Sequence, residues 1–274
     1  MSGESIKKIT YGPNHKPFSL MLATAFYEVK AYSPYIMSLI DSIRVLHELG
    51  VDWTFKSISG DSYVDRAKNS LIHDFLKSDY SHIFMIDSDE AWDVNGFCRI
   101  IKAAIMGAEI VGAAYPCKNN WEFYGCVPNK AEDGSFMGKE IGDMRLLDMW
   151  GIPGGFLIYS REAIERTRPK LNSYIIPENG ESVLECFRCN IEKDGGRVGE
   201  DIYMQLRYKD AGGIIWLEPN VTIQHYGVKE WVGNYNDYLL RQKAANDIEA
   251  SVGTTEAETA AMLAALGKKG DACA

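Results

Sequence analysis

The 274-residue sequence has no strongly basic segment, no dense cysteine pattern, and no apolar run of the roughly 18 residues that a membrane-spanning helix needs. The formal net charge of −9 argues against nucleic acid or an anionic membrane surface as a partner. The polar start, Met1–Lys16, does not resemble a signal peptide. We therefore expect a cytoplasmic protein with no transmembrane segment and no nucleic-acid partner.

Cysteine is also scarce. The six cysteines, at positions 98, 117, 126, 186, 189 and 273, are too few for a disulfide scaffold in a chain of this length. Cys186 and Cys189 form a Cys-x-x-Cys pair, which together with Cys117 and Cys126 is one way to build a four-thiolate zinc site. Because the other spacings are irregular and cysteine is a common small buried residue, we expect reduced thiols without zinc.

The first half of the chain alternates short apolar segments with helical patterns. Strands are expected over Phe18–Ala25, Asp52–Ile58, His82–Ile86 and Glu109–Ala114, and helices over Tyr35–Leu49, Ser62–Leu76 and Val94–Met106. The side chains expected to face inward are Ile36, Leu39, Ile40, Ile43 and Leu46 on the first helix, and Val64, Ala67, Leu71 and Phe75 on the second. This alternation predicts an α/β fold with a mostly parallel central sheet flanked by helices.

The second half is less regular. The expected elements are loops or short antiparallel pieces over 121–142, a strand over 156–159, a helix from Arg161, an irregular region over 171–199, a helix over 201–211, strands over 214–217 and 221–225, a helical region from Asn236, and a disordered tail over 267–274. We expect an N-terminal extension over 1–17, one domain over 18–235 and a C-terminal extension over 236–274.

Two carboxylates follow the most apolar strand. Asp87 and Asp89 come directly after His82–Ile86, and the carboxyl ends of such strands are where open α/β sheets bind ligands. If the chain stays extended, both side chains point to one side, where they would repel by roughly 4 kcal/mol at about 4 Å. A divalent cation is the simplest relief. The alternative is a purely structural role, in which Asp89 or Asp93 caps the next helix.

Three further features stand in a fixed order behind this motif. They are the Gly154-Gly155 pair before a strand, the Glu200-Asp201 pair that opens a helix, and a lone His225 that ends a late strand. Each also has an ordinary structural explanation. The glycine pair can form a turn, the acid pair suits the first turn of a helix, and the histidine can be a buried structural residue.

Taken together and in this order, the motifs over residues 18–230 resemble the glycosyltransferases of the GT-A fold. The resemblance implies a GT-A-like, Rossmann-like sheet with a nucleotide-binding half over 18–115 and a smaller, irregular or antiparallel acceptor half over 116–235. It also implies that Asp87 and Asp89 hold Mn²⁺ or Mg²⁺ against the diphosphate of a nucleotide sugar, and that His225 completes the metal shell. A carboxylate at Asp201, or otherwise at Glu200, would deprotonate the acceptor hydroxyl.

Other residues are candidates for contacts with the donor. Besides Asp87 and Ser88 of the motif, these are Thr24 near the base, Arg66, Asn69 and Lys118 near the phosphates, and Trp150, Gly154 and Gly155 around the sugar. For each of them a surface or strand-end position without ligand contact is the alternative. The aromatics Trp121, Tyr124, Trp231 and Tyr235 are expected either in the acceptor groove or in the core.

We therefore interpret the chain as a metal-dependent glycosyltransferase with a glycan or other hydroxyl acceptor, and we favour inversion over retention at the sugar carbon. A phosphatase of the haloacid dehalogenase type also places Asp-x-Asp after a buried strand. That motif continues to Thr or Val two residues after the second Asp, where this chain has Ala91. The third interpretation is a non-catalytic module that binds sugar nucleotides.

Overall fold

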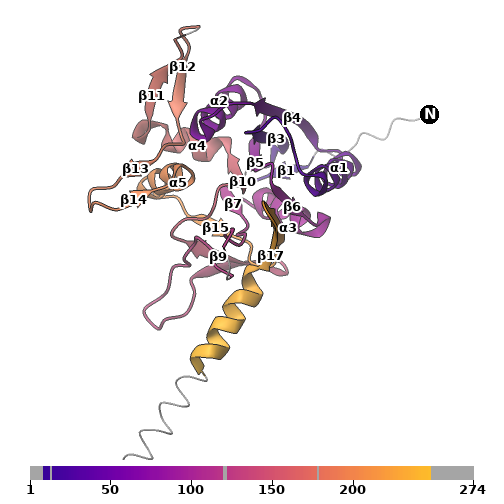
Figure 1. The fold of residues 1–274 in the computed structure, drawn as a ribbon, viewed down its shortest axis with the longest axis vertical. Helices are drawn as coiled ribbons and strands as arrows, with labels where there is room; N and C mark the ends of the chain where they lie inside the picture. The colour runs from indigo at the N-terminus through magenta and orange to yellow at the C-terminus, as the bar shows by residue number, and fades with distance from the viewer. Residues whose placement is uncertain (1–8, 13, 120–121, 178, 248–274) are drawn as a thin grey trace, which may run out of the picture. The chain divides into compact units, whose positions relative to one another are not determined.

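The structure is a computed structural model, and it describes residues 9–12, 14–119, 122–177 and 179–247 (Figure 1). The chain divides into two compact units, residues 1–235 and 236–274. In the second unit the described residues, 236–247, are helical. Trp121, Cys273 and the expected tail lie outside the described residues. Within the part of the chain that the structure describes, no helix is long and apolar enough to cross a bilayer.

An eight-stranded sheet forms the centre of the first unit (Figure 1). Its strands, in spatial order, are β4 (Asp52–Ser59), β3 (Ser19–Phe26), β5 (His82–Ile86), β10 (Phe156–Ser160), β7 (Ile110–Gly112), β15 (Ile215–Leu217), β9 (Met144–Met149) and β8 (Gly138–Ile141). The pairs β4–β3, β3–β5 and β7–β15 are parallel, and only β10 and β9 run against the common direction. The expected α/β fold with a mostly parallel sheet is confirmed.

Strand β10 fills a place that the sequence did not predict. It lies between β5 and β7 and is antiparallel to both. All five of its residues are buried, so its sequence is as uniformly apolar as that of a parallel strand, and hydrophobicity alone cannot give its direction. The register places Phe156 opposite Ile86, and the Asp87 amide donates to the Gly155 carbonyl at 2.8 Å. The Gly154-Gly155 pair therefore lies beside the Asp-x-Asp motif.

Helices cover the sheet. They are α1 (Ser33–Glu48), α2 (Val64–Lys77), α3 (Val94–Ile105), α4 (Arg161–Thr167) and α5 (Glu200–Asp210), and a short helix η1 (Arg168–Lys170) follows α4. The connections from β3 to β4 and from β4 to β5 run in opposite directions across the sheet. Because such crossovers are right-handed, α1 and α2 lie on opposite faces. Asp93 caps α3 by accepting the Gly96 amide at 2.8 Å, so Asp93 and not Asp89 takes the capping role.

Helix α1 buries Leu39 and Leu46 as predicted, and Ile43 packs against the core, but the buried face is rotated from the predicted one. Its buried residues are Tyr35, Leu39, Ser42 and Leu46. Ile36 and Ile40 are each 41% exposed, so their predicted inward orientation is wrong, as is that of Val64 on α2, which is 45% exposed. The buried stripe includes a serine because α1 packs on Trp92, whose indole nitrogen donates to the Ser42 hydroxyl at 2.9 Å. A polar residue, Ser42, therefore takes a core position that the hydrophobic pattern does not include.

Small sheets complete the first unit. A three-stranded sheet joins β6 (Glu90–Trp92), β16 (Thr222–Tyr226) and β17 (Glu230–Asn234). Three antiparallel pairs are β1 (Thr10–Tyr11) with β2 (Lys16–Pro17), β11 (Asn172–Ile175) with β12 (Ser182–Glu185), and β13 (Asn190–Ile191) with β14 (Arg197–Val198). The region over 171–199 was expected to be irregular, yet it contains two of these pairs. These strands are short, and none has an alternating apolar pattern, so the sequence does not reveal them.

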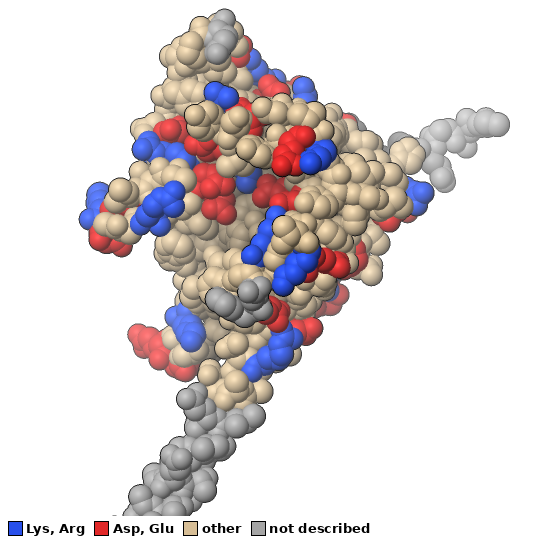
Figure 2. Space-filling model, viewed as in Figure 1, with Lys and Arg blue, Asp and Glu red and all other residues tan. Residues whose placement is uncertain are grey.

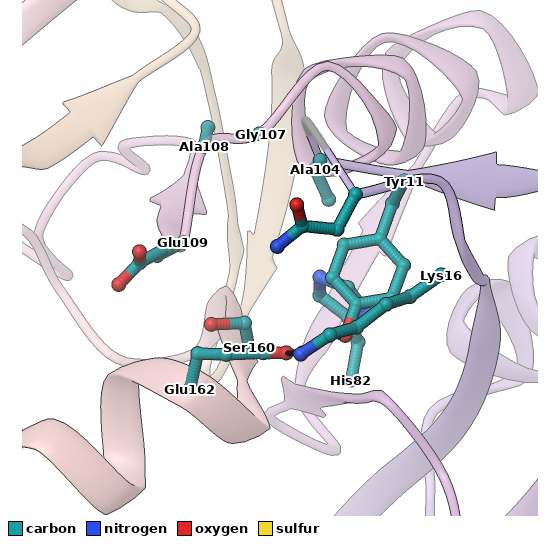
Figure 3. Close-up of a pocket in the computed structure, with 11 residues that line it drawn as sticks. Tyr11, Lys16, His82, Ala104, Gly107, Ala108, Glu109, Ser160 and Glu162 are labelled. Carbon is teal, nitrogen blue, oxygen red and sulfur yellow. Dashed lines mark hydrogen bonds and ion pairs between the residues drawn. The ribbon is translucent and has the colours of Figure 1, made fainter.

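A cavity of about 190 Å³ lies at the amino-terminal end of β5, at the opposite end of that strand from Asp87 (Figure 3). His82 lines it and is 1% exposed. The imidazole packs between the rings of Tyr11 and Phe18, with centroid distances of 4.6 and 4.7 Å. Its Nδ1 atom lies 2.9 Å from the Ser81 hydroxyl oxygen. Burial disfavours the imidazolium and lowers the pKa of His82 to about 3.

This low pKa predicts a specific loss of stability in acid. The unfolded chain binds a proton at His82 near pH 6.5, whereas the folded chain does so only near pH 3. The contribution of the neutral imidazole to the free energy of unfolding is therefore complete above pH 6.5 and decreases as the pH falls below that value. Between about pH 6 and pH 4, His82 makes the free energy of unfolding decrease by about 1.4 kcal/mol for each pH unit of acidification. We expect His82→Phe to remove this dependence. Urea unfolding at several pH values measures this. The control His15→Phe, at an exposed position, should keep the wild-type dependence.

Candidate active site

The Asp-x-Asp motif forms a tight turn at the end of β5. The Glu90 amide donates to the Asp87 carbonyl at 3.3 Å, so residues 87–89 do not stay extended as the spacing suggested. As a result the two carboxylates have different partners. Asp87 Oδ1 lies 3.2 Å from Lys68 Nζ, and Asp89 Oδ2 forms an ion pair with Lys118. The turn therefore spreads the two acids around one site.

Pairing of β6 with β16 brings His225 to this turn. His225 lies opposite Glu90 in the register, and the Tyr226 amide donates to the Asp89 carbonyl at 2.7 Å. The His225 Nδ1 atom is 2.9 Å from the Pro116 carbonyl oxygen, which can only accept a hydrogen bond. Nδ1 therefore carries the proton, and the Nε2 lone pair remains free at 3.9 Å from Asp89 Oδ2. Burial lowers the pKa of His225, which favours this neutral form.

Lys68 is a functional candidate that the sequence analysis missed. It lies on the buried face of α2 and is 3% exposed. Burial by itself lowers the pKa of Lys68, but the charges of Asp87, Glu200 and Asp201 outweigh it and raise the pKa above the usual value. The sequence did contain an indication that Lys68 is buried. Position 68 adjoins Ala67 and precedes Leu71 by nearly one helical turn, and both of these residues were expected on the buried face.

The first turn of α5 supplies the second pair of acids. Glu200 Oε1 lies 3.8 Å from Lys68 Nζ, and Asp201 Oδ2 accepts the Gly154 amide at 3.0 Å. Burial raises the pKa of Glu200, and the Lys68 charge opposes this rise. We call the hollow bounded by Asp87, Asp89, Glu200 and Asp201, with Lys68 between them, the acidic cleft. Figure 2 shows acidic side chains gathered around a hollow on the face seen in Figure 1, with basic side chains nearby.

Glu90 and Tyr115 lie behind the cleft, and neither was indicated by the sequence pattern. Glu90 is 0% exposed, and burial followed by the charges of Asp87 and Asp89 raises the pKa of its carboxyl well above the usual range. The Gly155 amide donates to the Tyr115 hydroxyl oxygen at 3.1 Å. A methyl group at Gly155 would clash with Glu90 and would come within 2.8 Å of both Asp87 Oδ2 and Tyr115. Glycine is therefore required at position 155 for these groups to approach the backbone.

Three residues that were predicted to contact the donor form hydrogen bonds or ion pairs within the protein. The Thr24 hydroxyl is buried and lies 2.6 Å from that of Tyr35. The buried Asn69 side chain donates a hydrogen bond to the Phe187 carbonyl at 2.9 Å and accepts one from the Phe187 backbone amide at 2.8 Å. Asn69 therefore links α2 to the segment after β12. Arg66 pairs with Asp61 at the surface, with donor–acceptor distances of 2.7 and 2.8 Å. Their contacts with a donor stay predictions.

The other predicted donor residues lie nearer to open space. Lys118 contacts Asp89 directly, and Trp150, after β9, is 45% exposed. Ser88 and Asp89 line a cavity of about 380 Å³ whose other wall is the loop after β3. The residues of that loop which line it are Tyr27, Glu28, Lys30, Ala31 and Tyr32. This cavity therefore lies directly beside the Asp-x-Asp turn.

The aromatic residues divide between core and surface. Tyr124 and Tyr235 are buried and pack edge to face with a centroid distance of 5.0 Å, so they belong to the core rather than to an open groove. Trp231 is partly buried, and its indole nitrogen donates to the Asn119 carbonyl. The described cysteines are free thiols, of which Cys186 is buried and Cys189 exposed.

The side chains around the Asp-x-Asp turn are of types that divalent cations bind. Two carboxylates and a neutral imidazole with a fixed tautomer suit Mn²⁺ or Mg²⁺, and the nitrogen favours Mn²⁺. In the residues described, no three acidic, histidine or cysteine side chains already converge on one point. The ammonium groups of Lys68 and Lys118 instead compensate the two aspartates. The buried Glu90 carboxyl, whose oxygens both lack a hydrogen-bond partner among the described residues, fits a cation at this place.

No protein-family model and no curated protein matches the sequence. Among solved structures, A197 from STIV is 18% identical, with a TM-score of 0.46, and the match covers 77% of this chain and 86% of that one. GalNAc-T7, solved with UDP, GalNAc and Mn²⁺, is 10% identical with a TM-score of 0.44, over 76% of this chain and 43% of that one. The 4-diphosphocytidyl-2C-methyl-D-erythritol synthase from Anaerococcus prevotii is 10% identical with a TM-score of 0.30, over 56% and 74%. These similarities are too low to assign a function, so the assignment depends on the chemistry of the acidic cleft.

Proposed function

We propose that the protein is a metal-dependent glycosyltransferase that moves a sugar from a nucleotide-diphosphate sugar to a hydroxyl group of a glycan or other acceptor, with inversion. One observation carries the proposal. Asp87, Asp89 and His225, whose side chains are of types that can ligate a cation, and a separate acid at Asp201 lie around one cleft, with a cavity beside the first set. Sugar transfer needs both groups, one to hold the leaving diphosphate and one to activate the acceptor.

The donor side of the cleft would bind the diphosphate. Asp87, Asp89 and His225 would hold Mn²⁺ or Mg²⁺, which when bound neutralises charge on the leaving diphosphate. Lys118, beside Asp89, supplies a second positive charge on the same side. Lys68 holds the Asp87 carboxylate in place from the buried side. Because Gly154 and Gly155 lack side chains, Asp201, Glu90 and Asp87 can pack closely against their backbone, which joins this side of the cleft to α5.

The acceptor side would remove a proton from the attacking hydroxyl. Asp201 accepts one backbone hydrogen bond through Oδ2, which fixes the carboxylate while leaving Oδ1 available to the acceptor. Glu200 faces Lys68 and is the less available of the two acids. Asp201 is therefore the proposed general base, and direct displacement with a base on this side gives inversion.

Nucleotide binding should require a divalent cation, because two carboxylates cannot contact phosphates favourably without one. Calorimetry with UDP, GDP, CDP and ADP in the presence of Mn²⁺ should identify one nucleotide that binds, and excess chelator should abolish that binding. Asp89→Asn should abolish it too, while Asp143→Asn, which replaces an exposed acid paired with Lys102, should have no effect. Equal affinity in chelator, or in Asp89→Asn, would contradict the cation assignment.

His225→Ala should weaken Mn²⁺ binding and move the preference from Mn²⁺ towards Mg²⁺, because the site loses its nitrogen ligand. Competition between the two metals, followed by calorimetry, measures the preference. The melting temperature should change little, because His225 is partly exposed and lies next to the last residue of β16, the central strand of a small three-stranded sheet. If the variant melts much earlier yet keeps normal metal affinity, the histidine has a structural role only.

Asp201→Asn should lower turnover by about 10²- to 10⁴-fold, the usual contribution of a positioned base, while donor binding persists. Asparagine keeps an oxygen for the Gly154 amide but cannot take a proton. Asp210→Asn, at the other end of α5, is the matched control and should be fully active. Proton NMR of the product gives its anomeric configuration, and retention would exclude this role for Asp201. Donor binding without any turnover in the wild-type protein would indicate a non-catalytic binding module.

A further inference from the structure

Glu90 is a buried acid without a hydrogen-bond partner in the described part of the chain. Both of its carboxyl oxygens are inaccessible, and neither has a hydrogen-bond partner among the described residues. Its neighbours on β6, Ala91 and Trp92, are buried as well, and they contribute apolar surface. An apolar residue would suit such a position better if packing were its only role, because a buried polar group without a partner is destabilising.

The carboxyl group of Glu90 faces the acidic cleft. Glu90 lies directly opposite His225 in the antiparallel pair of β6 and β16, and opposite residues project from the same face of a sheet. Glu90 Oε1 and Asp87 Oδ2 both border the small space that a side chain at Gly155 would fill. Glu90 therefore lies beside two of the three proposed cation ligands and comes from the buried side.

Among the described residues, no charged group compensates Glu90 by contact. Lys68 and Lys118 reduce the negative potential around it, but their ion pairs are with Asp87, Glu200 and Asp89. An occupant that satisfies Glu90 must therefore be small enough to reach the space next to Gly155 and must attract carboxylate oxygens. A divalent metal ion meets both conditions, whereas a second ammonium side chain or a sugar does not.

We propose that Glu90 is a third carboxylate ligand of the divalent cation, binding it from the buried side together with Asp87 and Asp89. This inference rests on the proposed function, since it extends the same cation site. It also explains why position 155 is glycine: any side chain there would occupy the space through which Glu90 and Asp87 approach one another. The cation would then have one ligand on its buried side whose position does not depend on Lys118 or on the loop after β3.

Titration of the whole chain with Mn²⁺ alone, followed by the loss of the free-ion EPR signal, tests the proposal. Glu90→Gln keeps the shape of the side chain but cannot become a carboxylate, and we expect Mn²⁺ affinity to fall by at least about tenfold, as for other groups that support a metal. Glu140→Gln, which replaces an exposed acid on β8, is the matched control and should bind like the wild type. Gly155→Ala should weaken Mn²⁺ binding as Glu90→Gln does.

The outcomes separate this inference from the proposed function. Unchanged Mn²⁺ affinity in Glu90→Gln, together with lost affinity in Asp89→Asn, would overturn the role of Glu90 and leave the cation site intact. Absence of Mn²⁺ binding in the wild type would overturn both. If Glu90→Gln melts too early to be titrated, Glu90→Asp decides, because it keeps the charge and shortens the side chain by one methylene. Weaker binding in that variant supports the proposal, and wild-type affinity refutes it.

Discussion

The buried ammonium group of Lys68 is the interaction on which the acidic cleft depends. Asp87 after β5 and Glu200 at the start of α5 come from distant parts of the sequence, and both lie within ion-pair distance of this one group. Without it, several carboxylates would share a partly buried space, and their mutual repulsion would separate the α5 terminus from the sheet. Lys68 in turn tolerates burial only because these acids surround it. Each charge is thus stable only in the presence of the others.

The alternating strands and helices of the first half were predictable because they repeat a strong pattern. Between β3 and α3, the strands β3 and β5 are apolar and each helix has an apolar stripe, so the boundaries followed within a few residues. The direction of β10, the exposure of Ile36 and Ile40, and the hairpins after η1 were not predictable. These depend on which elements meet in space, and the local sequence does not encode that information.

The candidate site shows the same division. Asp87, Asp89 and Asp201 stand at element boundaries, where charge after an apolar run is visible in the sequence, and the structure brings them around one cleft. Thr24, Arg66 and Asn69 stand at similar boundaries but use their polar groups on other protein residues. Glu90 could not be found from sequence because β6 is only three residues long and its burial arises entirely from pairing with β16. Position along the chain identifies candidates, and tertiary pairing determines the partners that each of them has in the protein.

The pairing of β6 with β16 also has a consequence for biosynthesis and folding. β6 and the two aspartates come early in the chain, whereas β16 is one of the last strands of the first unit. A nascent chain that has produced everything up to β15 already contains all eight strands of the central sheet, yet it still lacks the imidazole and the backbone donor that holds the Asp89 carbonyl. Such a long-range contact forms late, because closing a long loop has a large entropic cost. The imidazole and the hydrogen bond to the Asp89 carbonyl therefore join the acidic cleft only when synthesis of the first unit is nearly complete, after all strands of the central sheet have been made.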